Sequence, residues 1–166
     1  MGIVIRQQSE ERFVELMKWG FPTWRPSKRD SSKTVADYWT NARNLTASLW
    51  RKEAASTANR CLVPAVKFAE PNPAMGKGGN SWFGMADGGM FAFAGLWKQT
   101  NDGPHYAFLT TDPNPLVAPI HPKAMPVILQ RDDYSRWLDG APATELQAPF
   151  PSQLMRLLDS RAQPTA

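Results

Sequence analysis

The chain has 166 residues and a formal net charge of +4, which suits one globular domain and favours acidic partners such as nucleic acids. One cysteine excludes an internal disulfide and a cysteine-based zinc site, and we expect neither a metal nor a cofactor. No apolar run is long enough to predict a membrane span, so we expect a soluble, cytoplasmic monomer without a membrane partner.

The first half of the chain predicts strands mixed with short helices. Apolar residues at 9–18 have helical spacing, so the pattern alone allows a short helix there. Residues 21–34 hold two prolines and several cations, which predicts an exposed basic loop. Residues 50–58, rich in alanine and charge, predict a helix. Residues 61–66 and 67–70 predict strands around Pro64.

The second half predicts short strands separated by turns. Asp87-Gly88-Gly89 has the composition of a tight turn and predicts a hairpin between strands at 82–85 and 90–97. Gly95, inside the second strand, indicates the close approach of another backbone. The other expected elements are a flexible loop at 72–80, strands at 106–111 and 127–129, a helix start at 112–116 that prolines cut short, helices at 132–139 and 151–158, and a disordered tail at 160–166.

These elements predict the fold class. Many short strands with a few helices between them indicate an α+β domain built on a curved, barrel-like and mainly antiparallel sheet with flanking helices. The fifteen prolines and eleven glycines favour strands and loops over a helical bundle. We expect one domain that spans residues 1–159.

One histidine stands out because of its setting. His121 lies between Pro119 and Pro122, shortly before the apolar strand at 127–129, so a rigid, non-helical segment presents it. A histidine held this way can donate or accept a proton near neutral pH. The alternative is a structural histidine in a proline-rich loop.

Three further side chains allow more than one interpretation. Trp24 and Arg25 are neighbours, and an aromatic beside a cation suits the stacking of unpaired bases, although Trp24 could equally cap the core. His105 follows a glycine and a proline without a motif, which predicts a loop histidine. Cys61 predicts a small buried hydrophobic side chain.

Six segments, in this order, resemble the SOS response-associated peptidase (SRAP) family, whose members cross-link to abasic sites in DNA. The resemblance runs from about Met17 to Leu138 and implies a barrel-like sheet with a DNA channel across one side. It also implies strand, in place of helix, at 13–19. The segments are 17–26 (MKWGFPTWRP), 40–44 (TNARN), 60–70 (RCLVPAVKFAE), 91–97 (FAFAGLW), 108–114 (FLTTDPN) and 119–129 (PIHPKAMPVIL).

The resemblance implies roles for individual residues. Asn41 is similar to the asparagine that positions the N-terminal residue in the family, and Arg43 resembles the arginine that contacts a phosphate. Glu70 resembles the catalytic glutamate and His121 the catalytic histidine. Lys123 stands near the place where many relatives carry an arginine, and could replace that cation.

The family chemistry uses a cysteine at the mature N-terminus, and here this chain departs from the pattern. The chain begins Met1-Gly2-Ile3, and Cys61 falls in a core strand, so we expect the segment that carries the nucleophile to be missing. The resemblance implies abasic-site sensing and cross-linking in single-stranded DNA. The alternatives are a noncatalytic relative that binds single-stranded DNA, or a truncated product, and a peptidase-like hydrolase that processes itself.

Overall fold

A computed structural model describes residues 1–158, and the tail predicted at 160–166 lies outside the described residues. Five strands close into a barrel in the order β10-β2-β1-β6-β9, and β9 pairs back onto β10. All of these pairs are antiparallel except β10–β2, which is parallel. The barrel strands are β1 (Gly2–Gln8), β2 (Glu11–Trp19), β6 (Arg60–Ala65), β9 (Phe91–Thr100) and β10 (Gly103–Thr111).

Side-chain alternation along these strands builds two cores. Cys61 belongs to one cluster of buried residues and its neighbour Leu62 to the other, because successive residues of a strand face opposite sides. The cluster that contains Cys61 also holds Val4, Met17 and Tyr106, and it fills the barrel. The cluster that contains Leu62 lies on the outer surface, where the helices pack.

Gly95 shows how closely the barrel strands approach. A Cβ atom on Gly95 would lie 2.7 Å from the sulfur of Cys61 on the paired strand β6. The close approach predicted for Gly95 is therefore confirmed, and the burial predicted for Cys61 is confirmed by its zero exposure.

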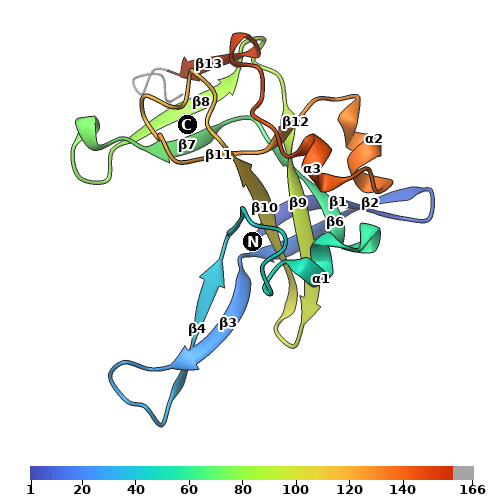
Figure 1. Cartoon of the computed structure of the whole chain (residues 1–166), viewed down its shortest axis with the longest axis vertical. Helices are drawn as coiled ribbons and strands as arrows, with labels where there is room; N and C mark the ends of the chain where they lie inside the picture. The colour runs from blue at the N-terminus through green and yellow to red at the C-terminus, as the bar shows by residue number, and fades with distance from the viewer. Residues whose placement is uncertain (159–166) are drawn as a thin grey trace.

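Three short helices cover the outer core, as Figure 1 shows: α1 (Arg51–Ala54), α2 (Asp133–Leu138) and α3 (Ala143–Leu146). Trp137 of α2 is fully buried, and its indole nitrogen donates to the carbonyl oxygen of Cys61 at 3.0 Å. Arg60 lies 4.4 Å from the Trp137 ring and donates to the Trp137 carbonyl oxygen at 3.0 Å. These contacts attach α2 to β6. No helix within residues 1–158 is long and apolar enough to cross a membrane.

The remaining strands surround one end of the barrel. A three-stranded sheet has the order β13-β8-β7, and short strands extend the edges of the barrel sheet. Phe68 and Phe83 of the small sheet stack at 5.2 Å and join it to the barrel core. These strands are β5 (Asn41–Ala42), β7 (Phe68–Pro71), β8 (Asn80–Met85), β11 (Met125–Pro126), β12 (Ile128–Leu129) and β13 (Met155–Leu158); the 3-10 turns are η1 (Thr57–Asn59), η2 (Pro73–Met75) and η3 (Ser152–Leu154).

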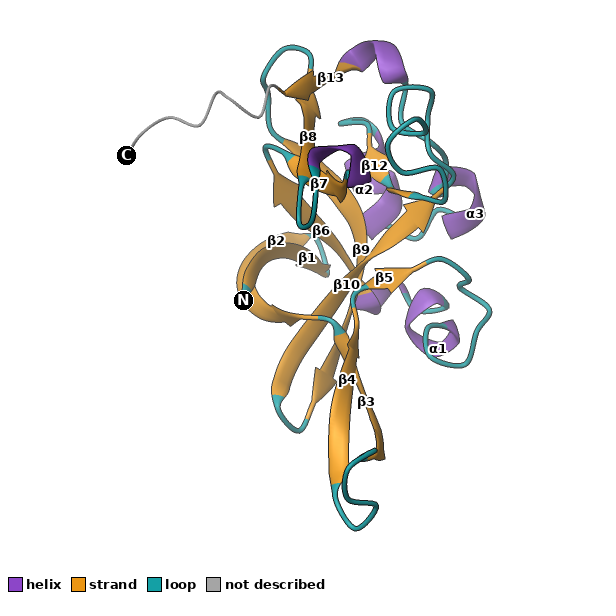
Figure 2. Ribbon diagram, turned by 90° about the vertical axis from the view of Figure 1, so that its left-hand side faces the viewer, coloured by secondary structure: helices purple, strands orange, loops and turns teal. Residues whose placement is uncertain are grey.

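A long hairpin projects away from the barrel. Strands β3 (Phe21–Pro26) and β4 (Thr34–Trp39) pair with each other and extend beyond the body of the molecule (Figures 1 and 2). The exposed basic loop predicted at 21–34 is therefore wrong for residues 21–26 and 34, which are strand, whereas residues 27–33 form the loop between the two strands. Cross-strand contacts form the hairpin in spite of the two prolines, whose missing N–H groups are tolerated on a sheet edge.

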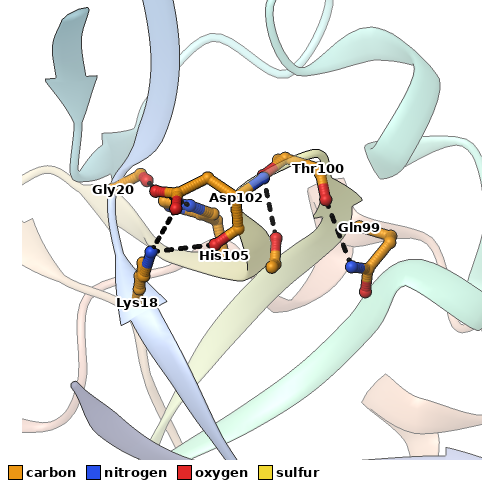
Figure 3. A network of polar contacts seen from close by, with 7 residues as sticks. Lys18, Gly20, Gln99, Thr100, Asp102 and His105 are labelled. Carbon is orange, nitrogen blue, oxygen red and sulfur yellow. Dashed lines mark hydrogen bonds and ion pairs between the residues drawn. The ribbon is translucent and has the colours of Figure 1, made fainter.

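His105 anchors the root of this hairpin, and Figure 3 shows the contacts. Its side chain is fully buried, and Nδ1 donates to the carbonyl oxygen of Gly20 at 2.7 Å. The ring also stacks on Tyr38 of β4 with 6.0 Å between centroids. Asp102, 3.8 Å from Nε2, forms an ion pair with Lys18 at 2.6 Å. The prediction of a loop histidine is wrong, because strand β10 carries His105 into a buried contact.

The predicted fold class is confirmed, and so are the strands expected at 61–66, 67–70, 106–111 and 127–129, within three residues at their ends. The strand implied at 13–19 is part of β2, and the helix predicted at 132–139 is α2. Among the described residues, parallel pairing is confined to β10, where β2 and β5 follow one another along the edge opposite β9.

Other element predictions are wrong. The strands on either side of Asp87-Gly88-Gly89 exist but do not pair with each other: β8 pairs with β7 and β13, and β9 pairs with β6, β10 and β12. The helix predicted at 151–158 is a 3-10 turn followed by β13, because pairing with β8 offers its backbone a sheet edge. The helix predicted at 50–58 is limited to α1, and the helix start expected at 112–116 is a turn.

Candidate active site

A cleft of about 600 Å³ opens at the end of the barrel that the small sheet borders. Its walls are aromatic: Trp19 and Phe108 stack with 5.5 Å between ring centroids, and Phe93 lies 5.0 Å from Phe108. These side chains share a face with the barrel core, so the cleft is the mouth of the barrel, a common place for ligand sites. Its polar groups are Asn41, Glu70, Thr110 and His121.

Glu70 and His121 meet in this cleft. Nδ1 of His121 lies 2.6 Å from Oε2 of Glu70, a distance typical of a charge-assisted hydrogen bond. The structure therefore brings together two residues that are 51 positions apart in the sequence. In this geometry the imidazole donates through Nδ1, and Nε2 remains for a substrate.

Glu70 and His121 differ in their exposure to solvent. Glu70 lies on β7, paired with Ser81 of β8, and is 8% exposed. The side chain of His121 is 34% exposed. Burial raises the pKa of Glu70 above its usual value, and the contact with His121 opposes this effect without overcoming it. A carboxyl group with a raised pKa can hold or release a proton closer to neutral pH.

Asn41 reaches the same cleft from a third element. Strand β5 places it beside Phe108, because β5 pairs in parallel with β10. The amide nitrogen of Phe108 donates to the carbonyl oxygen of Thr40 at 3.3 Å, which holds β5 against the barrel. The order of the motifs predicts one concave face for Asn41, Arg43, Glu70 and His121. Asn41, Glu70 and His121 line one cleft, whereas Arg43 lies outside its walls.

The four cationic or aromatic residues predicted to bind DNA lie outside the walls of this cleft. Arg43 forms an ion pair with Asp112, and both side chains are exposed. Lys123 is exposed, two residues beyond His121 on the same loop. Trp24 is 68% exposed on β3, and Arg25 pairs with Asp37 on β4.

The hairpin geometry also separates Trp24 from Arg25. Neighbours in a strand face opposite sides, and Arg25 shares its face with Asp37 whereas Trp24 lies opposite Ala36. Trp24 and Arg25 therefore lie on opposite faces of the hairpin, and their contact with DNA stays a prediction. Trp24 is free to meet a ligand from one side of the hairpin, and Arg25 is engaged on the other.

Sequence reasoning missed the aromatic walls of the cleft. Trp19 is 48% exposed although it ends a barrel strand, and Phe108 lies beside Asn41. Trp19 and the phenylalanines stood inside the quoted motifs, and alternation along β9 and β10 could have identified them as one face. No local signal links Phe108 with Asn41, because their pairing is parallel and distant in the sequence.

Cys61 cannot act in this cleft. It is fully buried in the barrel, and burial raises the pKa of its thiol. A buried thiol in apolar surroundings is inert as a nucleophile. Among residues 1–158, no group of three or more histidine, cysteine, aspartate or glutamate side chains could hold a metal ion.

Several solved protein structures have a fold similar to that of this chain. Similar solved structures include a Bordetella bronchiseptica protein with 30% sequence identity and a TM-score of 0.72, which this chain matches over 96% of its own length and 84% of the other. A Bacteroides thetaiotaomicron protein has 22% identity and a TM-score of 0.69, over 95% and 73% of the two chains. A phage-related protein from B. bronchiseptica has 19% identity and a TM-score of 0.69, over 96% and 78%.

No curated protein sequence matches the chain. The family model described as SOS response associated peptidase (SRAP) matches residues 1–161, which includes every described element. The aromatic mouth of the barrel and the contact between Glu70 and His121 thus lie within the matched region, and the chain belongs to the SRAP family.

Proposed function

We propose that this chain binds single-stranded DNA at abasic sites and that Glu70 and His121 move protons on the opened sugar. Membership in the SRAP family connects the chain with the SOS response. The observation that carries the proposal is the 2.6 Å contact between the two side chains at the mouth of the barrel. The raised pKa of Glu70 and the exposure of His121 suit a pair that exchanges protons with a substrate.

The chemistry of an abasic site explains why such a pair is useful. The deoxyribose is in equilibrium with an open-chain aldehyde, and ring opening requires a proton on the ring oxygen. Attack of an amine on the aldehyde gives an imine and releases one water, which leaves after the hydroxyl group is protonated. In our proposal His121 donates a proton to the ring oxygen, and Glu70 donates a proton to the departing hydroxyl group. Asn41 orients the amine.

The nucleophile is the second part of the proposal. A stable thiazolidine needs an amine and a thiol on adjacent carbons: the amine forms the imine, and the thiol then adds across its C=N bond. Cys61 has no such amine and lies inside the barrel. The thiazolidine route therefore needs a residue with a free amine and a thiol on adjacent carbons, as an N-terminal cysteine has, and Cys61 does not supply it.

A noncovalent role is the second candidate. The burial of Cys61 favours it, because this chain then has the cleft and the proton-transfer pair without an accessible thiol. Such a protein would bind single-stranded DNA by stacking bases on aromatic side chains and by attracting phosphates with Arg43 and Lys123. Both candidates include a monomer in the cytoplasm, which cell fractionation and size-exclusion chromatography would test.

Incubation with an abasic oligonucleotide separates the two candidates. We expect no heat-stable protein–DNA band from the present chain. Fusion of a family N-terminal segment that begins with cysteine should produce such a band. In the fused protein, Glu70→Ala or His121→Ala should slow its formation by roughly 10-fold or more, because a positioned acid or base is lost. A stable cross-link from the present chain, mapped by mass spectrometry to any residue, would contradict the assignment of the nucleophile.

DNA binding itself has a separate test. We expect tighter binding to single-stranded DNA than to duplex, and an affinity that falls steeply with salt because bound counterions are released. Trp24→Ala should weaken binding more than Arg25→Ala, since Asp37 already engages Arg25. Fluorescence anisotropy with labelled oligonucleotides measures both effects, and a preference for duplex would contradict the proposal.

A further inference from the structure

The loop that carries His121 is organised around one buried side chain, Asn114. Asn114 is 3% exposed, although it lies between Pro113 and Pro115 in a turn. Its side-chain oxygen accepts hydrogen bonds from the amide nitrogens of Leu116 at 3.1 Å and Val117 at 3.0 Å. Its side-chain nitrogen donates to the carbonyl oxygen of Phe150 at 2.7 Å. The amide therefore holds its own turn together and attaches that turn to the C-terminal segment.

Backbone hydrogen bonds continue from Asn114 to His121. The carbonyl oxygen of Asn114 accepts from Val117 and from Ala118, the latter at 2.9 Å. The carbonyl oxygen of Val117 then accepts from the amide nitrogen of His121, also at 2.9 Å. Val117 is fully buried, so this second turn has little freedom to shift. Two consecutive turns thus connect the Asn114 side chain with the backbone of His121.

We propose that Asn114 is a positioning residue: it sets the place of His121 opposite Glu70 through these two turns and the attachment to Phe150. The inference deepens the proposed function, since it names what holds the proton-transfer pair in register. His121 reaches Glu70 across a gap between two separate elements, a loop and strand β7, and no strand pairing joins them directly. A shift of about 1 Å in the loop would break a 2.6 Å contact.

The chemistry of the amide makes asparagine suitable for this position. The turn requires an acceptor for two N–H groups, and the attachment requires a donor for a carbonyl oxygen. An asparagine side chain provides both at once. Aspartate provides the acceptor only, and its charge would face the Phe150 carbonyl oxygen at 2.7 Å. Alanine provides neither, and would leave buried polar groups without partners.

The two histidines of the chain make a direct test possible without DNA. In a spectrum of protein labelled with nitrogen-15 on histidine, His121 reports the cleft and His105 reports the buried hairpin root. Glu70→Gln removes the carboxylate and defines the nitrogen-15 signals of His121 without its charged partner. We expect Asn114→Ala and Asn114→Asp to move the His121 signals by most of that difference, while the signals of His105 stay where they are.

A matched control comes from the same C-terminal segment. Gln147 also joins this segment to the barrel by a side-chain amide, which donates to the carbonyl oxygens of Arg43 at 2.8 Å and Thr110 at 2.9 Å. It has no connection to the turns before His121. Gln147→Ala should therefore leave the His121 signals as they are in the unmodified protein.

The outcomes divide cleanly. A change in the His121 signals alone, in both Asn114 variants, supports a positioning role. Unchanged His121 signals in either variant overturn it. A change in the signals of both histidines, or a change in the His121 signals in Gln147→Ala as well, shows general loosening of the fold. Either result also overturns the proposal. Loss of DNA cross-linking in the fused protein with an unchanged His121 would count against Asn114, and a His121 response without any DNA activity would count against the proposed function alone.

Discussion

The two histidines of this chain occupy regions that differ in every property that controls histidine chemistry. His121 lies on a loop at the mouth of the barrel, about one third exposed, with a carboxylate at 2.6 Å. His105 lies on a barrel strand, fully buried, with Nδ1 bound to a backbone carbonyl oxygen at 2.7 Å. One is placed to exchange protons with a ligand, and the other holds the root of the β3–β4 hairpin. Residue type alone does not separate these roles; the partner of the ring and its access to water do.

The carboxyl groups beside the two histidine rings also differ, in burial and in the direction of their pKa shifts. Glu70 is buried, and burial raises its pKa. Asp102 is exposed, and its contact with Lys18 lowers its pKa. The cleft therefore holds a carboxyl group that is easier to protonate than usual, and the hairpin root holds one that is harder to protonate. Opposite shifts of this kind are typical of a reactive site and of an ordinary surface ion pair respectively.

The largest expected effect is on stability, at the buried ring. His105→Ala removes a fully buried side chain and leaves the Gly20 carbonyl oxygen without its donor, so we expect a loss of about 3 kcal/mol. This corresponds to a fall in Tm of roughly 10 °C for a domain of this size. His121→Ala should cost about 1 kcal/mol, because that ring is already partly exposed to solvent. Urea unfolding followed by tryptophan fluorescence compares the two.

A refined version of this test uses His105→Asn, whose side-chain amide can still donate to Gly20 over a short reach. We expect the free energy of unfolding of His105→Asn to lie between those of the unmodified protein and His105→Ala. Equal losses for His105→Ala and His121→Ala would end the distinction between a structural and a reactive histidine.

The second expected effect links activity to stability at Glu70. Glu70→Gln removes the proton donor, and the cross-link of the fused protein should form roughly 10-fold or more slowly. The same change should stabilise the fold at neutral pH, because a buried carboxylate no longer has to be charged there.

The pH dependence follows from the direction of the shift. The folded state binds the Glu70 proton more tightly than the unfolded state, so stability falls as pH rises from the usual pKa of glutamate through the raised one. The advantage of Glu70→Gln should be complete above the raised pKa and absent below the usual one. Denaturation curves of both proteins across this interval measure it, and a constant difference at every pH would contradict the proposed burial effect.

The smallest expected effect is at the exposed partner of His105. Asp102→Asn breaks an ion pair with Lys18 that solvent screens, so we expect only a slight decrease in Tm at neutral pH. Because the pKa of Asp102 is lowered in the folded state, its stabilising contribution is present above the usual pKa of aspartate and is lost as pH falls through the lowered one. Thermal unfolding of both proteins at low and neutral pH checks this. A loss as large as that of His105→Ala would show that the ion pair, and not the ring, holds the hairpin root.

The cleft residues show how far sequence reasoning reached. Asn41, Glu70 and His121 were predicted from ordered motifs, and the structure places all three in one cleft. The aromatic walls and the organising role of Asn114 were not predicted. Both depend on contacts between distant segments, such as Phe108 beside Asn41 and Asn114 against Phe150, which leave no periodic signal along the chain.

Local patterns by themselves determined the strand segments predicted at 61–66, 67–70, 82–85, 90–97, 106–111 and 127–129. They also determined helix α2, the close approach at Gly95 and the burial of Cys61, because alternation, helical spacing and residue size act over a few neighbours. Tertiary structure alone decided the pairing. Strands β8 and β9 flank the turn at Gly88 but do not pair with each other. Residues 155–158 form strand β13 because β8 presents an open edge to them. Residues 21–39 form a hairpin in spite of two prolines. Tertiary structure also decided that His105 is buried and that Trp24 and Arg25 face apart. Each of these outcomes depends on which distant strand is adjacent, and that is set by closure of the whole barrel.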